Sequence, residues 1–282
     1  MKKAFLSGLL ALALLPGCSR LGVAWRFGPW MVERDAAERL DLPSAERPAL
    51  HLGVQAWARA VGRQVAPLLA SSARATALAV EAGQNHAAAA RMVDGAQRAW
   101  EAAAGAGEGP LAQLLAVQPL DRSKALQHFF AGKDAKDRAR WADPDHGAAA
   151  QAKQLMNTFK DYAGEPSEAQ GRLIVDWARH AEFPGPAFLA WRQDRENALA
   201  LALKPGVDPA LLQGLLHDWW ISHASRSPAL RQAMDAYHAR LQASLEALLA
   251  SLDQDQRRHL AERLRATAQD LDAIALKAWT PA

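Results

Sequence analysis

The residues best suited to chemistry lie in the segment His217-Asp218-Trp219-Trp220, followed by His223. On a helix, His217 and Trp220 share a face and Asp218 lies beside the next turn. A histidine next to a carboxylate can act as a general base or bind a metal ion. The alternative is that the tryptophans enter the core while the two histidines form hydrogen bonds at the edge of the helix. We favour this alternative, because a metal site usually takes three protein ligands and no third is identifiable.

Known catalytic patterns are absent from the rest of the sequence. It has no glycine loop ending in Lys-Ser or Lys-Thr, no His-Glu-x-x-His and no Gly-x-Ser-x-Gly. The glutamate-serine context of lytic transglycosylases is also missing. We therefore expect no cofactor and no metal, and we favour a binding component over an enzyme. The residues kept as a possible ligand-binding set are His217, Asp218, Trp220 and His223.

Cys18 is the only cysteine, and the residues before it suggest a role. A positive start, residues 1–3, precedes an apolar run over residues 4–15. As a helix these twelve residues would measure about 18 Å, well short of the ~30 Å hydrocarbon core of a bilayer. The pattern therefore predicts an export signal and not a membrane span.

The signal ends in Leu15-Pro16-Gly17-Cys18, which resembles the lipobox of bacterial lipoprotein precursors. The resemblance implies lipidation of the Cys18 sulfur, cleavage between Gly17 and Cys18, and anchoring in the membrane. Ser19, in place of an aspartate, implies the outer membrane. Two or three acyl chains hold a protein persistently, whereas one chain holds it only marginally. The alternative is an ordinary secretory signal that happens to contain a cysteine.

The composition favours an all-α fold. Alanine dominates the apolar half of the chain, and long unbranched side chains with high helix propensity are common. No alternating β-branched run indicates a strand. The net charge of +3 falls to +1 when Lys2 and Lys3 leave with the signal, and no basic stripe is present, so we expect no nucleic-acid partner.

Breaks in the helical pattern divide the mature chain. We expect a first helix over residues 25–40 and a long helical stretch over residues 45–104, bent at Pro67 and Gly83. Residues 105–110, rich in glycine, are expected to form a flexible loop. Short helices should follow, interrupted at residues 143–147.

Helix starts are better marked after residue 150. Ser167 with Gln170 and Asp253 with Gln256 fit capping boxes, in which each side chain satisfies a backbone donor. Capping residues also precede prolines at Asp208-Pro209 and Ser227-Pro228. Apolar residues three or four apart, over residues 234–252 and 260–274, predict two amphipathic helices folded back as an antiparallel hairpin.

Several segments resemble a family of uncharacterised bacterial lipoproteins, domain of unknown function 6279. The similarity is carried by residues 252–260 with Arg263-Leu264, by residues 166–170 with Trp177, and by Trp191-Arg192 with Arg195. Asp41-Leu42-Pro43 departs from the family, which has Asp-Leu-Thr there. The resemblance implies an envelope location and a helical fold, but no chemistry. Leu252 with Gln256 is also similar to the Leu-Thr-x-x-Gln motif of periplasmic stress chaperones, although a good helix start explains it as well.

The ten tryptophans allow two interpretations. They could form a carbohydrate-stacking surface for peptidoglycan, but their scatter from Trp25 to Trp279 favours one core anchor in each helix. Trp25 and Trp30 lie close to Cys18 and are expected to rest at the membrane interface.

We therefore predict a signal peptide over residues 1–17, a lipid-anchored tether over 18–21 and one all-helical periplasmic domain over 22–278. The expected fold is an elongated bundle of kinked helices and antiparallel hairpins without a sheet. The leading hypothesis is a non-enzymatic envelope lipoprotein that binds another protein or unfolded clients. The alternative is a peptidoglycan-binding protein or enzyme that uses the segment from His217 to His223.

Overall fold

The computed structural model describes residues 19–117, 122–142 and 144–279. Within them the chain forms ten α-helices and one short π-helix and no strand, which confirms the predicted all-α class. The helices are α2 (Ser19–Arg39), α3 (Arg47–Glu81), α4 (Asn85–Ala116), α5 (Ser123–Ala142), α6 (Pro144–Ala163), α7 (Glu168–His180), α8 (Gly185–Ala202), α9 (Pro209–His217), η1 (Asp218–Ser222), α10 (Pro228–Ala250) and α11 (Gln254–Trp279). No helix in these ranges combines the length and apolarity needed to cross a bilayer.

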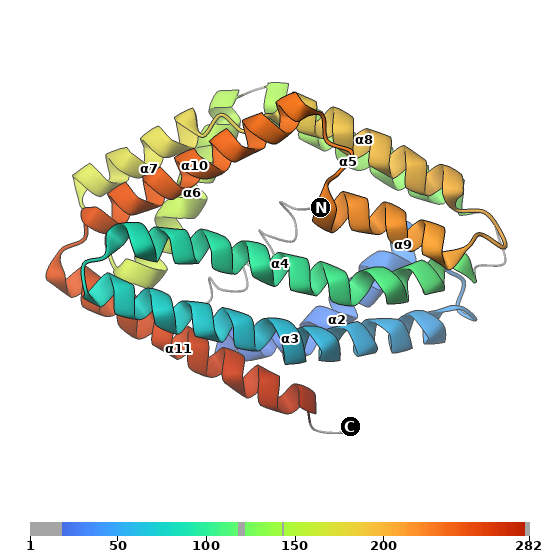
Figure 1. The fold of residues 1–282 in the computed structure, drawn as a ribbon, viewed down its shortest axis with the longest axis horizontal. Coiled ribbons are helices and arrows are strands. Elements are labelled where there is room, and N and C mark those ends of the chain that lie inside the picture. The colour runs from blue at the N-terminus through green and yellow to red at the C-terminus, as the bar shows by residue number, and fades with distance from the viewer. Residues whose placement is uncertain (1–18, 118–121, 143, 280–282) are drawn as a thin grey trace.

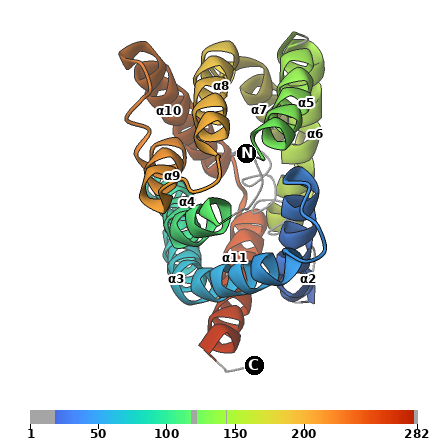
Figure 2. The same cartoon turned by 90° about the vertical axis from the view of Figure 1, so that its right-hand side faces the viewer.

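The antiparallel pair of α3 and α4 forms the base of the molecule (Figure 1). Helix α11 packs along the other side of α3, and α2 lies against both α3 and α11. Two further groups rise from this base, one of α6, α7 and α10 and the other of α5 and α8, while α9 returns onto α4 (Figures 1 and 2). The helices thus form a frame, and its inner faces carry the largest cluster of buried apolar side chains.

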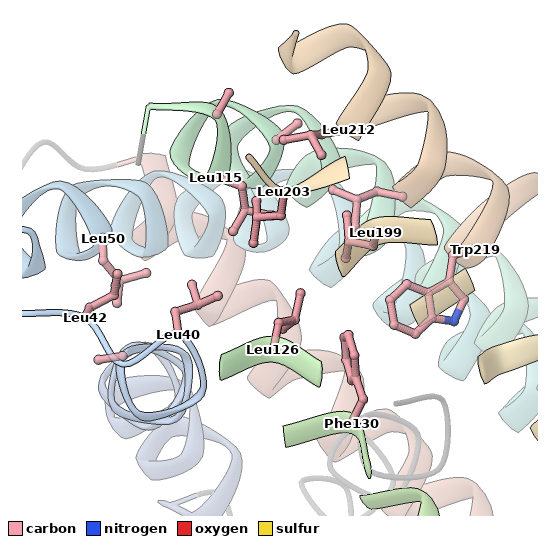
Figure 3. Packing of buried hydrophobic residues seen from close by; sticks show 14 of the residues in the cluster. Leu40, Leu42, Leu50, Leu115, Leu126, Phe130, Leu199, Leu203, Leu212 and Trp219 are labelled. Carbon is pink, nitrogen blue, oxygen red and sulfur yellow. The ribbon is translucent and has the colours of Figure 1, made fainter. Parts of the chain in front are cut away.

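The largest apolar cluster joins helices that are far apart in the sequence, from α2 to α10. Leu40 just after α2, Leu126 and Phe130 of α5, Leu199 of α8 and Trp219 of η1 are buried and turn toward one another (Figure 3). A second cluster holds α3 and α4 to α6, α7, α10 and α11 through alanines and leucines. Burial of these apolar surfaces stabilises the fold by about 25 cal/mol for each Å² removed from water.

Helices α2, α3 and α11 approach closely at Gly62. A Cβ atom there would lie 2.6 Å from the Cβ of Ala278 and 2.9 Å from the Trp25 ring. The Nε of Arg63 donates a hydrogen bond to the carbonyl of Ala278 at 2.9 Å, at the same crossing. Glycine is thus the residue that lets the first and last described helices meet on α3.

Both predicted capping boxes are present, and they interlock. The Gln170 side chain caps α7 with Ser167, and the Gln256 side chain caps α11 with Asp253. The two amides also bond to each other, from Gln170 Nε2 to Gln256 Oε1 at 2.7 Å and from Gln256 Nε2 to Gln170 Oε1 at 3.1 Å. Each remaining amide donor reaches a carbonyl of the opposite turn, at Ser251 and Glu165. All four amide bonding positions of each glutamine are therefore satisfied.

The predicted hairpin over residues 234–252 and 260–274 is wrong. Both segments are helical, in α10 and α11, but the two helices do not pack along one another. Helix α10 packs on α4 and α7, whereas α11 packs on α3 (Figure 1). The apolar stripes of α10 and α11 therefore face different neighbours. The interlocked glutamines place the start of α7 beside the turn between these two helices.

The predicted loop over residues 105–110 is also wrong, since these residues lie inside α4. A Cβ on Gly107 would lie 3.1 Å from the Trp57 ring, so glycine there serves close helix packing. The single long helical stretch predicted over residues 45–104, with a bend at Gly83, is wrong: the chain reverses there, since Gly83 has a φ of +68° and separates the antiparallel helices α3 and α4. Pro67 lies inside α3, as expected.

Candidate functional site

A cavity of about 540 Å³ lies between the helices that carry the largest apolar cluster. Small-molecule sites commonly measure ~300–1,000 Å³, so this volume suits a ligand. Its walls come from α2, α3, α4, α5, α8, α9 and η1, and most of the side chains are apolar. The lining residues are Met31, Val32, Arg34, Asp35, Ala36, Arg39, Leu40, Leu50, Gly53, Val54, Trp57, Trp100, Ala103, Ala104, Gly107, Pro110, Leu111, Leu114, Leu115, Leu126, Phe129, Phe130, Lys133, Leu199, Leu216, Trp219 and Trp220.

Helix α5 presents one continuous face to this cavity. Leu126, Phe129, Phe130 and Lys133 are spaced three or four residues apart and therefore share a side of the helix. The Phe130 ring packs edge-on against Trp219, with centroids 5.8 Å apart (Figure 3). This face is apolar until its last turn, where Lys133 adds a cation.

Two of the cavity's indole groups are fixed by hydrogen bonds to the backbone. Trp57 Nε1 donates to the carbonyl of Ala103 at 3.1 Å, and Trp100 Nε1 donates to the carbonyl of Trp220 at 2.8 Å. These bonds use the polar edges of the rings and leave their apolar faces for packing. The walls of the cavity are therefore held in place without a ligand.

Three donor atoms of lining residues have no such partner. Arg39 Nε, Lys133 Nζ and Trp220 Nε1 are buried, and none has a hydrogen-bond partner among the described residues. Arg39 is otherwise engaged, since it pairs with Asp35 and lies 4.3 Å over the Phe129 ring. Buried donors without acceptors are costly, at ~1–3 kcal/mol each.

Lys133 adjoins a buried charge cluster between α5 and α8. Arg192 binds Asp137 at 2.6 Å, pairs with Asp134, and approaches Glu196 at 3.3 Å. Glu196 is only 2% exposed, and burial raises the pKa of its carboxyl to about 7, although Arg192 acts in the opposite direction. Burial also lowers the pKa of the Lys133 amine. This part of the site therefore holds groups whose charge is sensitive to their surroundings.

The residues predicted as a possible ligand-binding set turn to different neighbours. His217 is exposed and its Nδ1 lies 3.2 Å from Glu108 Oε2 on α4. The His223 ring packs edge-on against Trp191 of α8, with centroids 5.6 Å apart. Trp220 lines the cavity and Trp219 is buried in the core. Within the described ranges, no three His, Cys, Asp or Glu side chains are grouped to hold a metal ion.

Asp218 forms the polar centre of this segment. It accepts hydrogen bonds from Arg195 at 3.0 Å and from the Ser225 amide at 2.9 Å. Burial alone would raise its pKa, but the hydrogen bonds from Ser225 and Arg195 lower it below the ordinary value. Asp218 is therefore held as a carboxylate that fastens the loop after η1 to α8.

The backbone of this segment is irregular. Residues 218–222 form a π-helical turn, and His223 follows with a φ of +53°. The extra residue of a π-turn changes the direction of the side chains that follow. Here Trp219 and Trp220 both reach the inside of the frame, although they are adjacent in the sequence.

The predicted lipidation and cleavage residues, Cys18 and Gly17, lie outside the described residues. The helix that follows them exposes apolar side chains on one face, with Phe27 53% exposed, Trp30 55% and Met31 47%. Trp25 instead packs against the base of the frame near Gly62. Of the two tryptophans expected at a membrane interface, Trp30 is thus exposed and Trp25 is largely taken up by packing.

Sequence reasoning did not identify the cavity, Lys133 or Glu196 as a site. Phe129, Phe130 and Lys133 at helical spacing, and Arg192 four residues before Glu196, were the available signals. Neither pattern shows that α5 and α8 pack together, because that contact joins residues more than fifty positions apart.

Comparison of the chain with protein-family models, with curated proteins and with solved structures found no match. The resemblance to the family of domain of unknown function 6279 therefore stays a prediction. Functional inference accordingly depends on the cavity and on the sequence.

Proposed function

We propose that this chain is a lipid-anchored, outer-membrane envelope protein that acts as a non-enzymatic binding protein. It holds the apolar part of another molecule, such as a partner protein, an unfolded client or a lipid, in the cavity between α2 and α9. The observation that carries this proposal is a cavity of about 540 Å³ with a mainly apolar lining. Each methylene group buried there contributes ~0.8 kcal/mol to binding.

The location is supported by the N-terminal part of the chain. Leu15-Pro16-Gly17-Cys18 resembles a lipobox, and α2 begins at the next residue with Phe27, Trp30 and Met31 exposed. Aromatic side chains favour the interface between lipid and water. A lipid on Cys18 together with this helix face would supply the two signals that stable anchoring needs.

Binding is tested with N-phenyl-1-naphthylamine, an uncharged probe that fluoresces in apolar sites. The protein is the chain that the proposed cleavage leaves, from residue 18, with Cys18→Ser. Gly53 lines the cavity and a Cβ there would meet no atom within 4 Å, so Gly53→Leu adds apolar volume at the cavity wall from a position with room for its Cβ. Gly214→Leu is the matched control, because Gly214 is an exposed helix glycine outside the cavity.

We expect the probe to bind the parent and the Gly214→Leu protein alike, and the Gly53→Leu protein several-fold more weakly. Equal binding by the two variants would remove the cavity as the site. A parent protein that does not bind the probe at all would refute the proposed function.

The anchor is tested by growing cells with radioactive palmitate. We expect label on the full-length protein and none on Cys18→Ser, with the protein in the outer-membrane fraction. An unlabelled product that keeps residues 1–17 would refute the location.

A further inference from the structure

The buried side-chain atoms that line the cavity include hydrogen-bond donors without acceptors. The three buried lining atoms without a partner among the described residues, Arg39 Nε, Lys133 Nζ and Trp220 Nε1, are all donors. Among the described lining residues, no buried side-chain acceptor lacks a hydrogen-bond partner. A molecule that brings hydrogen-bond acceptors would correct this imbalance.

A row of ring contacts connects the residues that carry the three donors. The Arg39 guanidinium lies over Phe129, and the Phe129 and Phe130 centroids are 5.6 Å apart. On the other side Phe130 packs against Trp219, whose ring is 6.4 Å from Trp220. Lys133 follows these phenylalanines by one turn of α5. The acceptor end of a ligand would therefore lie at the α5 side of the cavity.

The charges around the cavity favour an anion. Lys133, Arg39 and Arg34 line it. Arg39 pairs with Asp35 and Arg34 with Glu38, so Lys133 is the lining cation without an ion pair among the described residues. The two aspartates that follow Lys133 on α5 are bound by Arg192, and Glu196, which also acts on the charge of Lys133, lies outside the lining. A charge-assisted bond to Lys133 is about twice as strong as a neutral one.

The opposite wall offers an apolar surface. Leu50, Leu111, Leu115 and Leu216 line the cavity, together with alanines of α4. Met31 belongs both to the lining and to the exposed face of α2. One side of the cavity is thus continuous with the helix face proposed to rest on the membrane, from which a lipid would enter.

We propose that the cavity binds a single-chain amphiphile with an anionic head, of the class of a long-chain carboxylate. Its head is bonded by Lys133 and Trp220, and its tail lies along the leucine-rich wall. This inference rests on the proposed function and specifies the ligand class for the same site.

The test uses two sixteen-carbon probes that differ in their heads, palmitate and hexadecanol. Each competes against N-phenyl-1-naphthylamine on the Cys18→Ser chain from residue 18, at pH 7.5 and below the concentration at which palmitate forms micelles. Lys133→Met removes the cation and keeps most of the apolar stem, and Lys136→Met is the matched control because Lys136 is exposed on the same helix.

We expect palmitate to compete at a concentration at least ~10-fold lower than hexadecanol, the lower end of what a bond to a charged group contributes. Lys133→Met should lose this preference and still bind hexadecanol, while Lys136→Met should keep it. Lys133→Arg, which retains a cation, should keep a preference for palmitate and serves also where Lys133→Met does not fold.

Equal competition by the two probes on the parent protein would overturn the anionic preference and leave the apolar cavity standing. A preference that survives Lys133→Met, or that Lys133→Arg abolishes with hexadecanol binding unchanged, would overturn the role of the Lys133 cation. Failure of both probes, together with failure of the naphthylamine to bind, would instead refute the proposed function itself.

Discussion

The carboxyl group of Glu196 ties the stability of the protein to pH. It lies between α5 and α8, is 2% exposed, and has a pKa of about 7 against an ordinary value of 4.5. Burial is the main cause, since Arg192 nearby acts to lower the pKa. Glu196→Gln replaces the group with a neutral side chain of the same shape and so isolates its effect.

The folded protein binds the Glu196 proton more tightly than the unfolded chain does, and this sets how stability changes with pH. Between pH 4.5 and 7 the folded protein holds this proton and the unfolded chain releases it, so the contribution of Glu196 to stability falls as pH rises. Each pKa unit corresponds to about 1.4 kcal/mol, which gives a total of about 3 kcal/mol, most of it lost between pH 5 and pH 8. Glu196→Gln should match the parent near pH 4.5 and be more stable at pH 8 by roughly 2–3 kcal/mol.

Urea unfolding followed by circular dichroism at 222 nm, at several pH values from 4.5 to 8, measures this difference. Glu262→Gln is the control, because Glu262 is exposed and its replacement should leave the pH dependence of the parent in place. If the free energies of unfolding of the Glu196→Gln and parent proteins run parallel across this range, the account of Glu196 as a buried, protonated acid is refuted.

Three further predictions concern packing, capping and the histidine segment. Gly62→Ala should lower the free energy of unfolding by about 1–3 kcal/mol, because the added Cβ would meet Ala278. Gly214→Ala is the control and should raise the melting temperature, because a Cβ on Gly214 enters open space. A Gly62→Ala protein as stable as the parent would contradict the close approach of the helices. Gln170→Ala should cost about 2–4 kcal/mol in urea unfolding because it leaves Gln256 and two backbone groups without partners, against little change for the exposed Gln154→Ala. His217→Ala should cost under about 1 kcal/mol, because its pair with Glu108 leaves it 48% exposed; loss of envelope function in that folded variant would favour the alternative role of the His217 to His223 segment.

The helix starts could be predicted because their signals are local. Ser167 and Asp253 cap the helices that follow, with Gln170 and Gln256 three residues later, and all these bonds are present. A capping box needs only residues within one turn, so the sequence contains everything that determines it. The cap at Asp208 follows for the same reason.

The arrangement of helices could not be predicted in the same way. An amphipathic pattern shows that a helix has an apolar face but does not name the surface that covers it. The stripes of α10 and α11 therefore suggested a hairpin, whereas α4 and α3 cover them. The glycines near Gly107 were misread because glycine signals both a flexible loop and a close helix contact, and Trp57 decides between the two.

The cavity was beyond the reach of sequence patterns because its walls come from seven separate elements. Lys133 is an ordinary lysine in the sequence and becomes notable only in the fold, where it lines the cavity and lies near Arg192 and Glu196 of α8. The reverse holds for His217 and His223, which are prominent in the sequence but have separate partners in the fold. Sequence reasoning thus favoured residues that are close in number over residues that are close in space.

The contact of Arg63 with Ala278 has a consequence for how the chain reaches its native state. It joins positions 215 residues apart, and the whole length of α11 lies on a helix from the first third of the chain. A ribosome delivers α3 well before α11, so the surface of α3 that α11 covers stays open while the helices between them are made. Loops of this length close slowly compared with local helix formation. Until α11 docks, Ala66 and Ala70 of α3 lack the apolar neighbours that cover them in the folded protein.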